Sequence, residues 1–377
     1  MSAPASFLPR NAGGGKKLAL GLMSGTSADG VSIAIGSFGR RHFQTLYYQT
    51  FPYPPSVLKK ILAGPRLPAR EVSSLNFFLG HFFSRCVLKA IQKARLSSAE
   101  ISVIGSHGQT LYHGPSDHPP NTLQIGEASI LAEKTGLPVV SDFRPRDMAA
   151  GGEGAPLIPF FDNHFFGRGP VRALQNIGGI ANVTVVGKHQ RVIAFDTGPG
   201  NILMDEAIQK YSRGKSRFDR NGKIAAQGKI QMKAVLKMAA HPYFKKRPPK
   251  STGRELFNDR LTANFLSRLE IEDRLATLNY FTAHTIHQSY QKFFPEKISE
   301  VVVSGGGAFN KTLMRHLARL FDPVPVVSIE TYGVPAQAKE PLAFAFFALR
   351  ALEGKVNHLP EATGAKHARI LGKMTAP

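Results

Sequence analysis

The sequence predicts an α/β protein built from two related lobes. Predicted strands precede predicted helices in both halves of the chain, an order typical of α/β proteins. Each half also begins with a pair of strands that has a glycine-rich turn between them. With 377 residues, 42% of them hydrophobic, the chain is long enough for two ordinary domains, each with its own core.

In the first half, two apolar strands, Lys17–Leu22 and Val31–Ser37, are predicted on either side of the first glycine turn. Apolar residues then recur at helical spacing from Val72 to Cys86, which predicts a long helix over Glu71–Arg95. The remaining elements expected here are a short strand Ile101–Gly105, a helix Ala128–Thr135 that stops at Gly136, and a strand Pro138–Val140.

In the second half, a strand meander is expected first and long helical stretches follow it. The meander covers Ala173–Ile177, Ala181–Val186 and Arg191–Phe195. Next come helices over Asn201–Tyr211 and much of Arg260–Phe294, a strand Glu300–Ser304, a turn Gly305–Gly307, a helix Phe309–Leu320, and a helix Leu342–Leu352 ended by Gly354.

Composition excludes several classes of protein. No apolar run approaches the ~20 residues that a membrane helix needs, and the start of the chain does not resemble a signal peptide. Ser2–Gly15 is interpreted as a flexible tail. A single cysteine, Cys86, excludes an internal disulfide and a thiolate metal cluster, and its apolar helical setting favours a buried structural thiol.

The net charge of +22 is concentrated in one stretch, because Lys210–Arg260 holds 15 Lys and Arg against 3 Asp and Glu. No nucleic-acid recognition motif or zinc-finger spacing accompanies it, so we expect no specific nucleic-acid partner. A solvated basic face is the favoured interpretation, and electrostatic steering of an anionic substrate is the alternative.

The segment Gly21–Gly30 has the composition of a phosphate-binding turn. Ser24, Thr26 and Ser27 offer hydroxyls, and Gly25 and Gly30 let a phosphate approach the backbone. Asp29 is a candidate Mg²⁺ ligand, because hard cations prefer carboxylate oxygens. An ordinary hairpin turn with Asp-Gly at its tip explains the segment equally well. A Walker-type loop is absent from the sequence.

A second glycine turn, Phe195–Asn201, places Asp196 at the end of an apolar strand, where its carboxylate would face a cleft. There it is a candidate general base for phosphoryl transfer. The alternative, a helix cap, is weaker, because Asp196 lies five residues before Asn201, which is itself the better cap.

The third run, Ser304–Asn310, opens a predicted helix, and its glycines would let an adenine or ribose lie against the backbone. Glycine packing is the alternative. Glu330 and Glu340 flank the loop Thr331–Lys339, and one of them is a candidate second carboxylate. The histidines have no metal-binding spacing and are interpreted as structural or surface residues: His107, His113, His284 and His287.

Together, these residues resemble the anhydro-N-acetylmuramic acid kinase family, of the superfamily that includes hexokinase, actin and the heat-shock ATPases. The matching blocks occur in the family's order from Gly21 to about Gly372. They are Gly21–Gly30, Gly105–Thr110, Asp142–Arg144 with Asp147–Pro156, Asn176–Val183, Phe195–Asn201, Ser251–Asn258 and Ser304–Asn310.

The resemblance implies two lobes of actin- and hexokinase-like (ribonuclease H-like) architecture with an ATP cleft between them. The expected parts are a tail 1–15, an N-terminal lobe 16–142 plus 340–377, and a C-terminal lobe 143–339. The implied activity uses ATP, Mg²⁺ and water to open the 1,6-anhydro bridge of 1,6-anhydro-N-acetylmuramic acid and to phosphorylate O6, in cytoplasmic recycling of bacterial cell-wall sugars. A homodimer is also implied, with no membrane partner.

The resemblance also assigns roles to residues. Asp196 matches the base that activates water, Glu340 matches a second carboxylate near that water, and Asp29 is the implied metal ligand. The family usually has a second Asp at position 32, where this chain has Ser32. The implied sugar contacts are Gln109, Thr110, Arg144 and Asp147. The implied ATP contacts are Ser24, Gly25, Thr26, Ser27, Ala28, Asp29, Gly30, Val31, Ser32, Gly198, Gly305, Gly306 and Gly307.

Two rival functions stay open: another carbohydrate kinase of the same fold, and a non-catalytic ATP-binding protein like actin or the chaperones. The first would phosphorylate sugars that have no anhydro bridge. The second would transfer nothing to a sugar. The match at Thr110 and Arg144 favours a kinase over a binding protein.

Overall fold

The structure is a computed structural model that describes residues 16–25, 30–253, 255–294 and 297–377. The chain divides into two compact units. Unit 1 is formed by the chain up to Phe165 together with Gly333–Pro377, and unit 2 is Phe166–Tyr332. The helices are α1 (Pro55–Ala63), α2 (Ala69–Lys93), α3 (Ala128–Thr135), α4 (Phe143–Ala149), α5 (Ile158–Phe166), α6 (Ile202–Tyr211), α7 (Met232–Ala239), α8 (Asp259–Leu266), α9 (Ile271–Phe293), α10 (Lys311–Phe321), α11 (Lys339–Leu352) and α12 (Pro360–Thr363).

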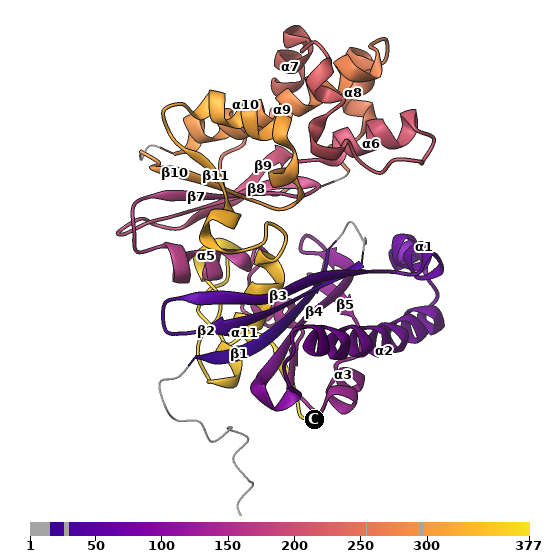
Figure 1. Ribbon diagram of the computed structural model, residues 1–377, viewed down its shortest axis with the longest axis vertical. Helices are drawn as coiled ribbons and strands as arrows, with labels where there is room; N and C mark the ends of the chain where they lie inside the picture. The colour runs from indigo at the N-terminus through magenta and orange to yellow at the C-terminus, as the bar shows by residue number, and fades with distance from the viewer. Residues whose placement is uncertain (1–15, 26–29, 254, 295–296) are drawn as a thin grey trace, which may run out of the picture. The chain divides into compact units, whose positions relative to one another are not determined.

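Unit 1 contains one mixed sheet, with the strand order β12-β6-β4-β1-β2-β3 and with β5 paired to β4 (Figure 1). Strands β1, β4 and β6 run parallel, whereas β2 and β3 continue from β1 as an antiparallel meander. The bounds are β1 (Lys17–Ser24), β2 (Gly30–Phe38), β3 (Phe43–Pro52), β4 (Ile101–Gly114), β5 (Asn121–Ile125), β6 (Val139–Ser141) and β12 (Lys373–Thr375).

Unit 2 contains a second sheet, with the strand order β11-β10-β7-β8-β9. Here β7, β10 and β11 are parallel, and β8 and β9 continue from β7 as an antiparallel meander. The bounds are β7 (Arg172–Ile177), β8 (Ile180–Val186), β9 (Ile193–Pro199), β10 (Glu300–Ser304) and β11 (Val326–Ser328). Both sheets therefore have a central strand with a meander on one side and parallel strands on the other, which confirms the prediction of two related α/β lobes.

The two faces of β1 are covered by different helices. Leu20 and Leu22 belong to the apolar core that β1 and β2 share with α2. Between them, Gly21 faces α11 and pairs in register with Gly105 of β4. A Cβ at Gly21 would overlap the carbonyl oxygen of Pro341, and one at Gly105 would overlap that of Phe344. The two glycines therefore let α11 approach the sheet at backbone distance.

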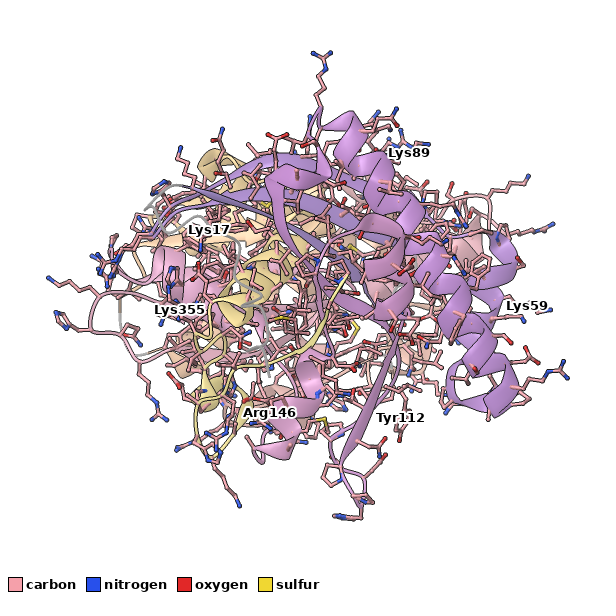
Figure 2. All side chains as sticks on the ribbon, turned by 90° about the horizontal axis from the view of Figure 1, so that it is seen from below. Lys17, Lys59, Lys89, Tyr112, Arg146 and Lys355 are labelled. Carbon is pink, nitrogen blue, oxygen red and sulfur yellow. The ribbon has the colours of Figure 1, made fainter. Side chains whose placement is uncertain are left out.

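The helices on the other face of this sheet are amphipathic. Leu75, Leu79, Phe83 and Val87 of α2 are buried in the core. Lys59 of α1 and Lys89 of α2 are exposed on the outer sides of their helices (Figure 2). Helix α3 ends at Gly136, whose φ of 66° is the left-handed conformation that favours glycine.

In the lobes implied by the resemblance, the chain passes to the second lobe at 142/143 and returns at 339/340. In the structure, it passes to unit 2 after Phe165 and returns to unit 1 at Gly333. Aromatic packing explains where the chain leaves unit 1. Phe143 of α4 lies 5.3 Å from Phe344 between ring centroids, and Phe165 of α5 lies 4.9 Å from Phe346. Helix α4 and all of α5 except its last residue, Phe166, therefore belong with α11 in unit 1.

The expected end of one strand in unit 1 and the expected start of one helix in unit 2 are wrong. The strand predicted over Ile101–Gly105 continues as β4 to Gly114, so the motif Ser106–Thr110 lies inside a strand and not in a loop after it. The helix predicted to begin at Phe309 begins at Lys311, because Asn310 caps it by accepting a hydrogen bond from the Leu313 N–H at 3.0 Å.

The glycine contact predicts a large cost for one added methyl group. We expect Gly21→Ala to lower the free energy of unfolding by about 3 kcal/mol, because the Pro341 carbonyl cannot move without shifting α11. Urea unfolding followed by circular dichroism would measure this. The control is Gly136→Ala, where a Cβ would meet nothing within 4 Å and only backbone strain of about 1 kcal/mol is expected. Equal losses in the two variants would contradict the close-packing explanation.

Candidate active site

In unit 1, Gln109 of β4 holds the start of the first glycine turn, and Ser24 links that start to Gly30. The buried Ser24 hydroxyl donates to Gln109 Oε1 at 2.5 Å and lies 2.9 Å from the Gly30 carbonyl oxygen. Gln109 Nε2 lies 3.5 Å from the carbonyl oxygen of Gly25. The structure thus brings together Ser24 and Gln109, which the sequence assigned to different ligands. The tip of the turn, Thr26, Ser27, Ala28 and Asp29, lies outside the described residues.

Beyond the turn, β2 carries two of the residues assigned to ATP. Val31 is fully buried in the apolar core of unit 1. Ser32 is half-buried, and its Oγ lies 2.8 Å from Oγ1 of Thr50 on β3. Both positions therefore have protein partners on the meander side of the sheet.

Arg144, in the first turn of α4, is held by two acceptors. Its Nε donates to His107 Nε2 at 3.0 Å, and its Nη1 donates to the Gly154 carbonyl at 3.3 Å. His107 Nδ1 lies 3.0 Å from the carbonyl oxygen of Gly108. An Nε2 that accepts requires the hydrogen on Nδ1, so the partners select a neutral imidazole. Burial and the Arg144 charge lower the pKa of His107 to about 3, which keeps it an acceptor.

The sequence predicted only a structural or surface role for His107, and its contact with Arg144 was missed. The one available signal was its position in the block Gly105–Thr110. His107 and Gln109 of this block are both buried. Thr110 is half-buried, and its Oγ1 accepts from Gln124 Nε2 at 3.4 Å.

Glu340 lies in the first turn of α11, where the helix dipole favours a carboxylate. Burial raises its pKa, whereas the charges of Lys339 and Arg144 lower it. Burial also disfavours the charged form of Arg144, so it lowers the pKa of Arg144 to about 10. The charges of Glu340 and Asp147 oppose that shift. The structure therefore brings Arg144 and Glu340, predicted from distant segments, into one electrostatic environment within unit 1.

Asp147 is fully buried, and its carboxylate accepts three hydrogen bonds. The donors are the Gly154 N–H at 2.8 Å, the Thr363 hydroxyl at 2.7 Å and His358 Nδ1 at 2.9 Å. Burial would raise its pKa, but the bonds from His358, Thr363 and Gly154 more than offset this and hold the pKa below its usual range. Through Gly154, Asp147 fixes the carbonyl group that binds Arg144.

In unit 2, Asp196 lies within β9 and not at the end of a strand as expected, because β9 continues to Pro199. Its Oδ2 accepts from the Thr252 N–H at 2.9 Å. Its backbone N–H donates to the Lys250 carbonyl at 3.0 Å, and its carbonyl accepts from the Tyr243 hydroxyl at 2.6 Å. Burial raises the pKa of Asp196 to about 6, against the opposing effects of the Thr252 N–H and the Lys250 charge.

The remaining glycines assigned to ATP in unit 2 have backbone roles. Gly198 and Gly305 have φ of 146° and 83°, conformations that side chains rarely adopt. Gly306 and Gly307 form the first turn of a short 3₁₀ helix, Gly306–Phe309, which precedes α10. Asn201 was expected to cap α6 with its side chain, but its Nδ2 instead donates to the Ile177 carbonyl at 3.3 Å.

Comparison with known proteins identifies the family. Residues 17–377 match the sequence pattern of the family described as anhydro-N-acetylmuramic acid kinase. Relatives of that name from Caldanaerobacter subterraneus subsp. tengcongensis and Bacillus cereus are 43% and 40% identical, covering 96% and 95% of this chain and 97% and 98% of theirs. The chain belongs to the anhydro-N-acetylmuramic acid kinase family. The resemblance seen in the sequence is confirmed, and the protein is a phosphotransferase of this family.

One solved structure to which the chain is similar is an activator of the 2-hydroxyisocaproyl-CoA dehydratase from Clostridium difficile with bound ADPNP. It is 14% identical with a TM-score of 0.46, covering 89% of this chain and 96% of that chain. None of the described helices has the length and apolarity needed to cross a membrane. The described residues also contain no group of three or more His, Cys, Asp or Glu placed to hold a metal ion.

The Asp147 contacts predict a charge-dependent contribution to stability. We expect Asp147→Asn to destabilise unit 1 by about 3 kcal/mol at pH 7, because the amide nitrogen in place of Oδ2 would face the Gly154 N–H, which is itself a donor. Since the folded-state pKa is lowered, this contribution is present above the unfolded-state pKa and is lost as pH falls through the folded-state value. Urea unfolding at several pH values should therefore show the difference from the unsubstituted chain shrinking in acid. A pH-independent difference would contradict the electrostatic explanation.

Proposed function

We propose that this chain opens the 1,6-anhydro bridge of 1,6-anhydro-N-acetylmuramic acid with water and phosphorylates O6 from ATP. The products are N-acetylmuramic acid 6-phosphate and ADP. The observation that carries the proposal is the environment of the Asp196 carboxylate. It is half-buried, its Oδ2 accepts a hydrogen bond from the Thr252 N–H, and burial raises its pKa to about 6. A general base is most effective when its pKa lies near the working pH.

The reaction needs a group that accepts a proton from the attacking water. It also needs O6 to be able to leave the anomeric carbon and bond to the γ-phosphorus. Thr252 engages Oδ2 of Asp196, and no hydrogen bond within the described part of the chain engages Oδ1. We assign to Oδ1 the proton of the attacking water. The water oxygen bonds to the anomeric carbon, the C1–O6 bond breaks with its electron pair on O6, and O6 bonds to the γ-phosphorus as ADP leaves.

Sugar recognition is proposed for unit 1. Arg144 presents a cationic guanidinium whose orientation is fixed by His107 and Gly154, which suits the acidic lactyl group of the sugar. Glu340, whose pKa is raised by burial, is proposed as the second carboxylate near the water. Gln109 and Thr110 contribute polar groups from the same strand. Asp147 is proposed to act through Gly154, because its carboxylate already accepts three protein donors.

Nucleotide binding is assigned to Ser24–Ser32, Gly198 and Gly305–Gly307. The hydroxyls of Ser24 and Ser32 and the amide of Gln109 are neutral oxygen donors, compatible with Mg²⁺ that arrives on the phosphates and keeps most of its water. Asp29 would add a carboxylate. When bound, Mg²⁺ would neutralise charge on the transferred phosphoryl group. From the family resemblance we also propose that the protein acts in the cytoplasm, as a homodimer.

The proposed reaction predicts where a labelled water oxygen goes. Incubation of 1,6-anhydro-N-acetylmuramic acid with the protein, ATP and Mg²⁺ in ¹⁸O-water should give a 6-phosphorylated sugar with one ¹⁸O at the anomeric hydroxyl and none in the phosphate. Mass spectrometry locates the label, and the product is read promptly because the anomeric hydroxyl exchanges. N-acetylmuramic acid without the bridge is the control. Preferential phosphorylation of the unbridged sugar would favour the other carbohydrate kinases.

Removing the proposed base should affect turnover and not folding. We expect Asp196→Asn to lower kcat by roughly 10²–10⁴-fold while ATP binding and thermal unfolding stay near those of the unsubstituted chain. In the unsubstituted chain, kcat/KM should fall about tenfold per pH unit below pH 6, because the base must be ionised. Glu133→Gln, which changes an exposed carboxylate of α3 in unit 1, is the control. Near-normal turnover of Asp196→Asn would remove Asp196 from the mechanism.

A further inference from the structure

The segment Lys250–Thr252 lies against β9 and contacts Asp196 from two directions. The Lys250 carbonyl accepts from the Asp196 N–H at 3.0 Å, and the Thr252 N–H donates to the Asp196 carboxylate at 2.9 Å. Because one residue separates these two contacts, the direction of the carboxylate is fixed by the backbone of the segment. The Tyr243 hydroxyl, at 2.6 Å from the Asp196 carbonyl, adds a third attachment.

The Lys250 side chain is held by aromatic rings. Its Nζ lies 4.7 Å from the ring centroids of both Tyr243 and Phe293, and 5.6 Å from that of Phe195, the neighbour of Asp196. Ring faces attract a cation without accepting its proton. We define these three rings as the aromatic cage.

The ammonium in the cage keeps much of its charge uncompensated. Its one hydrogen bond to another described residue is a long one, 3.4 Å to the Tyr243 carbonyl. No ion pair joins Lys250 to an acid in the part of the chain that the structure describes. Burial and the nearby Lys292 and Lys246 lower the pKa of Lys250 to about 8, so it is mostly protonated at pH 7.

Few charged side chains in the described part of the chain act on Asp196. Lys250 favours the ionised carboxylate, whereas Glu255 and burial oppose ionisation. Tyr243 faces it as a neutral phenol whose own pKa is raised by burial. Lys292 of α9 donates to the Phe244 carbonyl at 3.3 Å, and it and Lys246 act on Lys250. Among the described residues, Lys250 is therefore the positive side chain that offsets the burial of Asp196.

We propose that Lys250 is a positioning residue for Asp196, whose caged ammonium keeps the carboxylate ionised near neutral pH while its backbone segment aims it. The aromatic cage has a specific purpose in this arrangement. It holds the cation over the ring of Phe195, the neighbour of Asp196 in β9, with no ion pair to a described acid. The ammonium therefore does not occupy the oxygen that must take a proton. This inference rests on the proposed function of Asp196 only where it predicts a change in the pH dependence of kcat/KM.

The test is a pH titration of Asp196 in the full chain labelled with ¹³C at the aspartate carboxyl carbon, with Asp196→Asn used to assign the signal. In Lys250→Met, which keeps the length of the side chain and packs well against aromatic rings, we expect the midpoint to rise by about one pH unit. Lys250→Arg keeps the charge and the cation–π contact, so its midpoint should stay unchanged. Lys245→Met removes an exposed charge outside the cage and is the matched control.

An unchanged midpoint in Lys250→Met, or an equal shift in Lys245→Met, would overturn the inference. Lys250→Gln is a second neutral variant if the Met variant unfolds early. The acid limb of kcat/KM, measured on the same variants, separates the two proposals. If the NMR midpoint rises but the acid limb does not follow it, Lys250 controls the carboxylate and Asp196 is not the base.

Discussion

The close approach of α11 to the sheet of unit 1 is the constraint on which this half of the candidate site depends. Gly21 and Gly105 lie side by side on parallel strands, and each faces a backbone carbonyl of α11. The same helix carries Glu340 in its first turn and Phe344 one turn later. Phe344 lies 4.7 Å from the ring of His107, which accepts from Arg144. One helix–sheet contact therefore positions the Glu340 carboxyl group, the Arg144 guanidinium and the imidazole of His107 that accepts from it.

Buried polar contacts extend this framework to the C-terminal segment. Asp147 binds His358 and Thr363, which lie more than 200 residues further along the chain. His358 Nε2 in turn accepts from the Arg369 N–H at 2.8 Å, so the imidazole is neutral with its hydrogen on Nδ1. A buried carboxylate without such donors would be costly. With these donors, the Asp147 carboxylate fixes the turn at Gly154, and the Gly154 carbonyl in turn orients Arg144.

The sequence predicted the repeated α/β order and the central strands because their apolar runs are long and bounded by glycine. It was less successful where glycine and polar residues lie inside a strand. Gly105 and Gly108 suggested that β4 ends early, yet glycine is needed there for packing against α11 and for a φ of 75° at Gly108. Asp196 was likewise placed at a strand end, because carboxylates are rare in strand interiors. No helix was predicted over α4, whose Pro145 lies in the first turn, where proline is tolerated.

Two aspartates show how the environment separates roles that the sequence cannot distinguish. Asp147 follows a basic segment and Asp196 an apolar one, yet both belong to blocks of the family resemblance. Three donors hold the pKa of the first below its usual range, whereas burial with a single donor raises the pKa of the second to about 6. A carboxylate saturated by protein donors stabilises a fold and binds protons weakly. One that is under-solvated, with an oxygen left to accept, is suited to take a proton from water. The number of donors around each carboxylate, set by contacts between distant segments, therefore shifts the two pKa values in opposite directions.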